Sequence, residues 1–241
     1  MSLNRINSAA EIMLLNSVTE QNCAISVFNQ TWESRNSTEI TPNLLQAMVH
    51  SGSYLAGAFI DNRCVGASFA FPASNGDLHL HSHMTAVIKE FRDKGVGEAL
   101  KIHQWHWAKK ENYPFISWTF DPLMSRNARF NLTKLGVEIL GYYPNFYGIM
   151  EDKINKDDES DRLMVTWKTS DYPSTTNTSS FESQMNDILI QIPEDILKIR
   201  EQDKVTSMKW RIQVRHEFLN LLHKGGKVVG FSEKNQYVVR M

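Results

Sequence analysis

The chain has 241 residues, of which 41% are hydrophobic and 22% are charged, a composition typical of a folded globular protein rather than a disordered one. Its 26 basic and 27 acidic side chains give a formal net charge of −1, which argues against a broad electrostatic grip on nucleic acid but leaves a small polyanionic ligand open. With two cysteines, no signal-peptide pattern in residues 1–10 and no apolar run long enough to span a membrane, we expect a cytoplasmic chain without disulfides.

The first third of the chain predicts one strand, two helices and three further strands. Thr41 and Pro42 form the N-cap and first-turn pair of the second helix, which stops at Gly52. Asp61-Asn62-Arg63 joins two apolar runs as a hairpin turn. The other elements are the strands 11–15, 54–60, 64–71 and 78–88 and the helix 20–32.

From residue 95 the apolar residues recur at helical spacing. Val96, Leu100, His103 and Trp107 predict a helix over 95–110 with one buried stripe. Gly136 follows a second helix at the position typical of a C-terminal glycine. The further elements are the strands 115–120, 137–143 and 163–167 and the helix 127–135.

The end of the chain predicts a linker and a small extension. Residues 169–183 are dominated by Ser, Thr, Asn and Asp, which favours a polar linker. Residues 184–241 predict a strand at 188–192, a helix from Pro193 and a strand at 227–231. Because so short a segment buries little core of its own, we expect it to dock on a main domain formed by residues 1–168. The whole pattern indicates an α/β fold with a mixed sheet and a small C-terminal α/β extension.

A glycine pair marks the junction between strand 78–88 and the helix that follows. The sequence there is Arg92-Asp93-Lys94-Gly95-Val96-Gly97. Glycines at such a turn let backbone N–H groups and a helix N-terminus approach a phosphate closely. The Walker and Rossmann glycine motifs are absent. A plain glycine turn remains the alternative.

With this turn, residues 11–168 resemble the GNAT superfamily of acyl-CoA-dependent N-acyltransferases. The resemblance rests on Arg92-x-x-Gly95-x-Gly97, on Asn127 with the later Lys134-Leu135-Gly136, and on the order of strands and helices. Residues 118–132 resemble a branch of predicted acetyltransferases associated with N-acylamino-acid racemases, which points to amino-acid acylation, including succinylation.

The resemblance implies acetyl-CoA or another acyl-CoA as cosubstrate, and no metal. The resemblance also implies a bulge that interrupts strand pairing, and the pantetheine arm is expected on the backbone groups left unpaired there. The N–H near Val87 is expected to stabilise the oxyanion. Glycine-turn amides are expected on the pyrophosphate, with Arg92 and Lys94 adding charge. The implied cofactor-binding residues are Thr85, Ala86, Val87, Arg92, Lys94, Gly95, Val96, Gly97 and Asn127.

The reaction needs a base, because an alkylamine is protonated near pH 7. His79, His81 and His83 alternate along one strand and so share a face. His81 lies where several family members place a glutamate base, and an ordinary imidazole pKa of about 6.5 suits the task. His81 is the first choice and His83 the second. Structural histidines and a zinc site are the alternatives.

The general acid is where the sequence departs from the family. Leu132 occupies the position at which the family commonly has a tyrosine that protonates the leaving thiolate. The candidate acids lie on or after the next strand and are Tyr142, Tyr143 and Tyr147, with core or rim packing as the alternative. Unassisted departure of the thiolate also stays open.

Two further residues are candidates for acceptor binding. Asp121 is a candidate for the acceptor ammonium, with a helix N-cap before Pro122 as the favoured alternative. Arg129 is a candidate for a carboxylate, with a solvated helix position as the alternative. The acidic run at 157–159 reads as solvated surface.

These patterns together predict transfer of an acetyl or succinyl group from acyl-CoA to a primary amine of a small molecule, with an amino acid as the first candidate. Attack is expected to be direct, in a ternary complex. A non-catalytic acyl-CoA sensor and a protein-lysine acetyltransferase are the alternatives. We expect neither nucleic acid nor membrane as partner, and a homodimer stays open.

Overall fold

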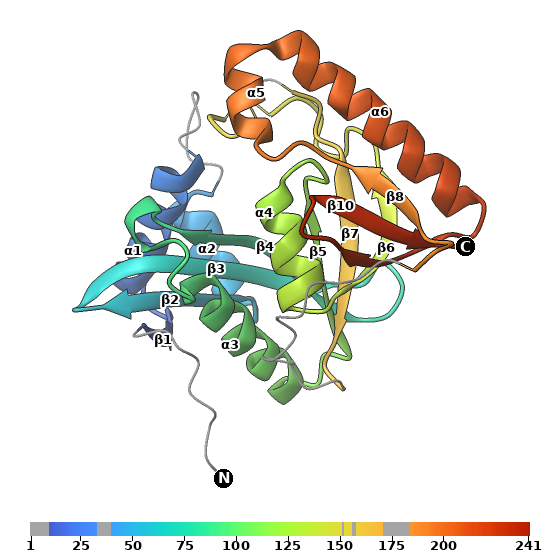
Figure 1. Cartoon of the computed structure of the whole chain (residues 1–241). Coiled ribbons are helices and arrows are strands. Elements are labelled where there is room, and N and C mark those ends of the chain that lie inside the picture. The colour runs from blue at the N-terminus through green and yellow to red at the C-terminus, as the bar shows by residue number, and fades with distance from the viewer. Residues whose placement is uncertain (1–9, 33–39, 151, 156–157, 171–183) are drawn as a thin grey trace. The chain divides into compact units, whose positions relative to one another are not determined.

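The computed structural model describes residues 10–32, 40–150, 152–155, 158–170 and 184–241 (Figure 1). The contacts divide the chain into two compact units, one of residues 1–117 with 168–171 and one of residues 118–167 with 172–241. Apart from Thr169 and Ser170, the predicted linker at 169–183 lies outside the described residues.

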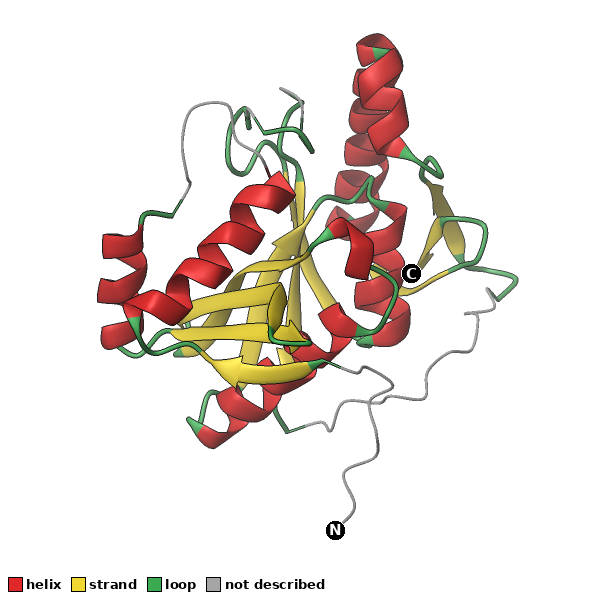
Figure 2. Cartoon of the chain, turned by 90° about the vertical axis from the view of Figure 1, so that its left-hand side faces the viewer, coloured by secondary structure: helices red, strands yellow, loops and turns green. Residues whose placement is uncertain are grey.

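The first unit is built on a mixed sheet. Within it the strands lie in the order β1-β2-β3-β4-β5. Neighbours among the first four are antiparallel, and β4 and β5 are parallel. Helices α1 and α2 lie on one face and α3 on the other (Figure 2). The elements are β1 (Glu11–Leu14), α1 (Val18–Trp32), α2 (Pro42–His50), β2 (Tyr54–Ile60), β3 (Arg63–Ala73), β4 (His79–Val87), η1 (Lys89–Phe91), α3 (Val96–Lys110) and the first part of β5 (Phe115–Phe120).

The start of α2 is fixed by its sequence. Thr41 has extended backbone angles, and its side chain accepts a hydrogen bond from the Leu44 N–H, which satisfies one of the unpaired donors of the first turn. Pro42 follows at the first helical position. The predicted cap is confirmed, and it helps hold Leu45 in the core with Phe28 and Phe69.

The buried face of α3 is broader than the predicted stripe. Val96 and Leu100 are buried as expected, but His103 and Trp107 are only half-buried. The helix contacts β2, β3 and β4, and so broad a contact buries residues on both sides of the stripe. The additional buried residues are Ala99, Lys101, Ile102, Gln104, Trp105 and Ala108.

The second unit holds the end of β5, an antiparallel pair and a separate antiparallel sheet. Strand β6 pairs with β7, and the second sheet has the order β8-β10-β9. The last segment before β6 is a π-helix, in which the Leu135 N–H bonds to the Phe130 carbonyl. The elements are α4 (Ser125–Ala128), η2 (Arg129–Lys134), β6 (Glu138–Tyr143), β7 (Arg162–Lys168), β8 (Ile188–Gln191), α5 (Ile196–Gln202), α6 (Lys204–His223), β9 (Lys227–Phe231) and β10 (Gln236–Arg240).

The C-terminal segment packs on residues 118–167. The Tyr237 hydroxyl donates to the Pro122 carbonyl at 2.8 Å, and the Ser125 hydroxyl donates to the Glu194 carbonyl at 2.7 Å. This packing is why the compact units divide at residue 117 and not at the predicted boundary at 168.

The sequence prediction differs from the structure at two places in this unit. The single helix predicted from Pro193 is two helices, because Asp203 is extended (φ −150°) and caps α6 by accepting from the Thr206 N–H. Strand β10 was not predicted, although it pairs with both β8 and β9.

Candidate functional site

Strand β4 carries one extra residue at His83. On the neighbouring strand, Phe69 pairs with Met84 and the next residue, Ala70, pairs with Ser82. His83 therefore has no partner on β3, which is a β-bulge. The bulge that the family resemblance implies is present in this strand.

The bulge changes which β4 side chains face α3. In a regular strand, residues three apart point to opposite faces. Here Ser82 accepts a hydrogen bond from Lys101 of α3 at 2.9 Å. The Thr85 hydroxyl lies 2.9 Å from that of Ser68, which accepts from Gln104 of α3 at 3.0 Å. Both therefore face α3, so the strand beyond the bulge is turned over relative to the strand before it.

A buried lysine lies beneath this strand and was missed by sequence reasoning. Lys101 is 3% exposed, and Nζ also donates to Gln104 Oε1 at 3.0 Å. Burial lowers the pKa of Lys101 well below its ordinary value. In the sequence, a lysine and a glutamine three residues apart on a helix are typical of a solvated face, so only the unusual breadth of the α3 interface reveals them.

Beyond the bulge, β4 has an edge that faces away from β3. The Ile88 N–H donates to a β3 carbonyl at 3.0 Å, and backbone groups of successive residues point to alternate edges. The Val87 N–H and C=O thus face the other edge, where the carbonyl accepts from Arg92 Nε at 3.1 Å. The same alternation puts Thr85 on the Val87 side and Ala86 toward β3. This favours Thr85 and Val87 over Ala86 as donors to a ligand.

His81 lies before the bulge and is half-buried. It pairs with Ser117 in the parallel β4–β5 ladder, and its Nδ1 lies 2.9 Å from Ser117 Oγ. Burial, together with the positive charges of the neighbouring histidines and Lys101, lowers the pKa of His81 to about 4. The expectation of an ordinary pKa was wrong, and the imidazole is neutral at pH 7. When Nδ1 donates its proton to Ser117, Nε2 keeps a lone pair for a proton.

The other two histidines have different surroundings. His79 is 4% exposed, stacks on Phe115 at 4.5 Å and places Nδ1 2.7 Å from the Asp77 carbonyl. His83 is exposed at the bulge, with its ring 5.7 Å from that of Phe71. His79 is therefore a packed histidine, whereas His83 is open to solvent. Within the described ranges, no three His, Cys, Asp or Glu side chains are grouped to hold a metal ion.

The glycine turn ends in an open helix N-terminus. Gly95 has φ 77° and Asp93 φ 61°, left-handed angles that favour glycine strongly and tolerate aspartate. Gly95 is the N-cap of α3, and as a glycine it has no side chain that could accept a hydrogen bond from the first turn. A Cβ built at Gly97 would meet nothing nearer than 3.8 Å, at Val87. Neither glycine therefore places a side chain over the first amides of α3, as in helix N-termini that bind anions.

Two cationic side chains flank this turn. Arg92 bonds through Nε to the Val87 carbonyl, as described above, and Lys94 Nζ lies 4.9 Å above the Phe91 ring. The backbone contacts of Arg92 fix the turn to the end of β4. Positive charge therefore stands beside the first amides of α3.

In the second unit, Asp121 is buried and held by two arginines. Arg211 Nη1 lies 2.8 Å from Oδ1, and Arg200 Nη2 lies 2.5 Å from Oδ2. These guanidinium groups outweigh the burial and lower the pKa of Asp121 well below its ordinary range. The predicted N-cap role is wrong, because Oδ1 closes a turn with the Leu123 N–H and no helix begins at Pro122.

The acidic run at 157–159 is also engaged in ion pairs. Asp158 Oδ2 lies 3.0 and 2.9 Å from the same two arginines. Glu159 pairs with Arg215. The expectation of a solvated run is wrong for Asp158, which is half-buried, and is confirmed for Glu159, which is exposed. Residue 157 lies outside the described residues.

Arg129 and Asn127 lie on the segment that leads to β6. Arg129 donates to Asn235 Oδ1 at 3.1 Å and covers the Phe231 ring at 5.5 Å. It therefore fastens the C-terminal sheet, and the expectation of a solvated position is wrong. Asn127 is half-buried in α4.

Two of the three candidate acids are exposed. Tyr143 is 43% and Tyr147 40% exposed. The Tyr147 hydroxyl lies 3.1 Å from Thr119 Oγ1, and Arg162 lies 5.3 Å over its ring. The preceding Tyr142 is instead buried, so it has a packing role.

Residues 21–136 match the Acetyltransferase (GNAT) family. The matched segment includes the Arg92–Gly97 turn and the Lys134–Gly136 signature. The chain carries a GNAT acetyltransferase domain. This domain indicates an N-acetyltransferase.

Solved GNAT structures have the same fold. An N-acetyltransferase from Staphylococcus aureus is 17% identical, with a TM-score of 0.51, and the alignment covers 67% of this chain and 99% of that one. An Arabidopsis thaliana protein bound to the bisubstrate analogue CoA-Ac-MVNAL is 18% identical, with a TM-score of 0.51 and coverage of 66% and 99%. A GNAT acetyltransferase from Elizabethkingia anophelis with acetyl-CoA bound is 17% identical, with a TM-score of 0.50 and coverage of 66% and 98%.

No curated protein sequence matches the chain. In the part of the chain that the structure describes, none of the helices has the length and apolar character needed to cross a bilayer. Leu132, at the usual tyrosine position of the GNAT domain, is half-buried in η2.

Proposed function

We propose that the chain transfers an acetyl group from acetyl-CoA to a primary amine of a small molecule, with an amino acid as the first candidate. The observation that carries the proposal is the open N-terminus of α3 beside the free edge of the bulged β4. A turn that presents amides to a phosphate and a strand edge that presents amides to an extended arm together suit a nucleotide-linked pantetheine thioester.

In this proposal each part of the first unit binds one part of the cofactor. The amides of Gly95, Val96 and Gly97 bind the pyrophosphate, and Arg92 and Lys94 add charge. The Thr85 and Val87 backbone groups bind the pantetheine arm as a false strand. The Val87 N–H then polarises the thioester carbonyl, and such a donor contributes about 3 kcal/mol to oxyanion stabilisation in comparable sites.

The reaction is a direct acyl transfer. The neutral amine attacks the thioester carbon, the C–N bond forms, and the C–S bond breaks as the tetrahedral intermediate collapses. Nε2 of His81 accepts the proton that the nitrogen loses. Protonation of the leaving thiolate by Tyr143 or Tyr147 stays a prediction, which rests on the lack of an acidic proton in the Leu132 side chain.

The acceptor is the least constrained part of the proposal. The near-neutral net charge supports a small amine over a charged protein surface. Asp121 and Arg129 make contacts inside the second unit, so we assign them to holding the segments of that unit together. Succinyl transfer, a racemase-associated substrate, a homodimer and a cytoplasmic location remain predictions.

Calorimetry with coenzyme A and acetyl-CoA tests the cofactor site. Gly97→Val adds a branched side chain whose Cβ would lie 3.8 Å from a Val87 methyl group, an ordinary van der Waals distance, so the variant is expected to fold while obstructing the pyrophosphate. We expect a loss of affinity of at least about tenfold, since close approach of the backbone requires a missing side chain. Unfolding in urea serves as the folding control. Equal affinity of wild type and variant, or no binding of either ligand to wild type, contradicts the proposal.

A non-catalytic acyl-CoA sensor is the second candidate, favoured by Leu132 at the family's acid position. Release of free coenzyme A is measured with acetyl-CoA or succinyl-CoA and a panel of free amino acids. Turnover with any acceptor contradicts the sensor. Binding without turnover across the panel contradicts the enzyme.

A further inference from the structure

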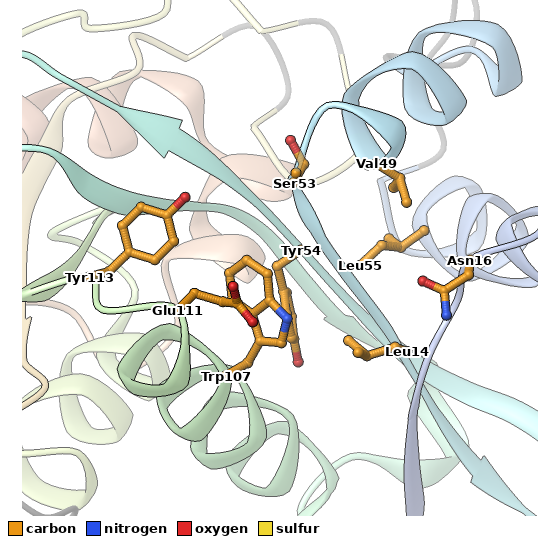
Figure 3. A pocket seen from close by; sticks show the side chains of 10 residues that line it. Leu14, Asn16, Val49, Ser53, Tyr54, Leu55, Trp107, Glu111 and Tyr113 are labelled. Atoms are coloured by element: carbon orange, nitrogen blue, oxygen red, sulfur yellow. The ribbon is translucent and has the colours of Figure 1, made fainter.

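A cavity of about 360 Å³ opens in the first unit at the end of α3 opposite the glycine turn (Figure 3). It lies where the end of β1, the end of α2 and the start of β2 meet the last turn of α3. The 15 residues of α3 span about 22 Å at 1.5 Å per residue. The cavity is therefore separate from the predicted cofactor turn. Its volume is in the lower part of the range typical of small-molecule pockets.

The charge of this cavity has one sign. Among the residues that the structure describes, Glu111 is the only Asp, Glu, Lys or Arg that lines it. No described residue forms an ion pair or a side-chain hydrogen bond with the Glu111 carboxylate. The carboxylate also stands at the C-terminal end of α3, where the last carbonyls carry partial negative charge. Both contributions favour a cation and disfavour an anion.

Aromatic rings stand beside the carboxylate. The Trp107 ring lies 5.2 Å from that of Tyr54 and 6.0 Å from that of Tyr113, the latter at an interplanar angle of 24°. Trp107 and Tyr113 are half-buried. Burial and the Glu111 charge both raise the pKa of Tyr113, in keeping with a carboxylate close to the phenol. Ring faces next to a carboxylate are the surroundings that bind ammonium groups.

The far side of the cavity is lined by apolar side chains and two polar ones. Leu14, Val49 and Leu55 line it together with Asn16 and Ser53, and Figure 3 shows these side chains across from the aromatic group. Such a wall suits a short alkyl chain, and the side-chain oxygens of Asn16 and Ser53 can accept N–H or O–H hydrogen bonds.

We propose that this cavity is a binding site for a small organic ammonium ion, with the ammonium at Glu111 and Trp107 and the alkyl chain toward Leu55. The site is distinct from the acyl-transfer site and does not depend on the activity proposed above.

The test is calorimetric titration of the full chain with n-butylammonium and, as its neutral counterpart, 1-butanol. We expect n-butylammonium to bind and 1-butanol to bind at least about fivefold more weakly. The aromatic rings and the Glu111 carboxylate attract the positive charge of the ammonium, which the alcohol lacks. Glu111→Gln is expected to lower the affinity for n-butylammonium by a similar factor. Asp61→Asn is the matched control, since it removes the same charge from the hairpin at the other end of β2.

The outcomes separate the proposal from its competitors. Loss of affinity in Glu111→Gln with retention in Asp61→Asn supports it. Equal binding of the amine and the alcohol, no binding of n-butylammonium, or an equal effect of the two substitutions overturns it. Binding at an acceptor site elsewhere would leave Glu111→Gln unchanged, and that result also overturns it. Urea unfolding of both variants confirms that each is folded.

Discussion

The three alternating histidines of β4 share a sequence pattern but not an environment. His79 is packed under Phe115, His81 is half-buried against Ser117, and His83 is exposed at the bulge. The alternation predicted a shared face, and that is the information a strand period holds. Burial and ring contacts depend on the neighbouring strands, so no spacing within β4 could rank the three as bases.

His81→Ala tests the base. The imidazole is neutral across the working pH range because its pKa lies near 4, so we expect coenzyme A release to fall by at least about 100-fold at every pH from about 6 to about 9. The acid limb of the wild-type rate is expected to follow the amine and not His81. His83→Ala is the matched control. A rate that His81→Ala leaves unchanged, or lowers no more than His83→Ala does, removes His81 from the mechanism.

Lys101→Met tests the buried lysine. The folded state lowers the pKa of Lys101, so the unfolded chain binds more protons below the ordinary Lys value of about 10.4, and the stability of the wild type rises with pH. The sign is the opposite of that for a lysine held by an ion pair. We expect the unfolding free energy of wild type minus variant to rise by up to about 1.4 kcal/mol for each pH unit between about pH 7 and about pH 9.

Urea unfolding of both proteins at several pH values measures this difference. Lys109→Met, an exposed lysine on the same helix, is the control and should show no such slope. A difference between wild type and Lys101→Met that stays constant with pH would show that Nζ has an ordinary pKa.

At the scale of elements, periodicity and caps predicted most of the chain. The Thr41–Pro42 pair sets the start of α2, and the change to helical spacing after residue 95 marks α3. The bulge in β4 was expected only from the family resemblance, because no spacing within the strand shows it and it exists only in the register between β3 and β4. The break between α5 and α6 at Asp203 was also missed. The apolar residues of α6 recur at helical spacing, and this spacing does not show where the helix begins.

Asp203→Ala tests the cap between α5 and α6. Its carboxylate accepts hydrogen bonds from the Thr206 N–H and hydroxyl. We expect the substitution to lower the unfolding free energy, because the first turn of α6 loses its N-cap acceptor. Asp203→Asn keeps an acceptor and should lower it less. Thermal unfolding followed by circular dichroism compares them, and equal midpoints for wild type and Asp203→Ala would show that the cap contributes nothing.

At the scale of the whole molecule, buried ion pairs join segments far apart in sequence. Asp121 follows β5, whereas Arg200 and Arg211 lie on α5 and α6. The sequence shows each residue alone, and a lone aspartate before a proline is typical of a helix cap. The two pairs join residues 79 and 90 positions apart in the sequence. They form because the C-terminal segment packs on residues 118–167. The sequence predicts only that so short a segment docks on another part of the chain.

Asp121→Asn tests this cluster. The change leaves two buried guanidinium groups with less compensating charge, so we expect a loss of about 3–5 kcal/mol. Because the folded pKa of Asp121 is depressed, its contribution is present above the ordinary aspartate value of about 3.9 and is lost only as pH falls further. Wild type should therefore keep its advantage over the variant down to about pH 4 in urea unfolding. Asp187→Asn, which releases the partly exposed Arg240, is the control and should cost less.

The extra residue in β4 gives that strand two independent phases. Before His83 the even-numbered residues, such as Ser82, face α3, and after it the odd-numbered residues, such as Thr85, do so. Deleting a single codon there would invert everything that follows, up to the glycine turn, while leaving the first half untouched. The strand thus consists of two adjoining segments, and the residue count at the bulge sets which positions of the second segment face α3.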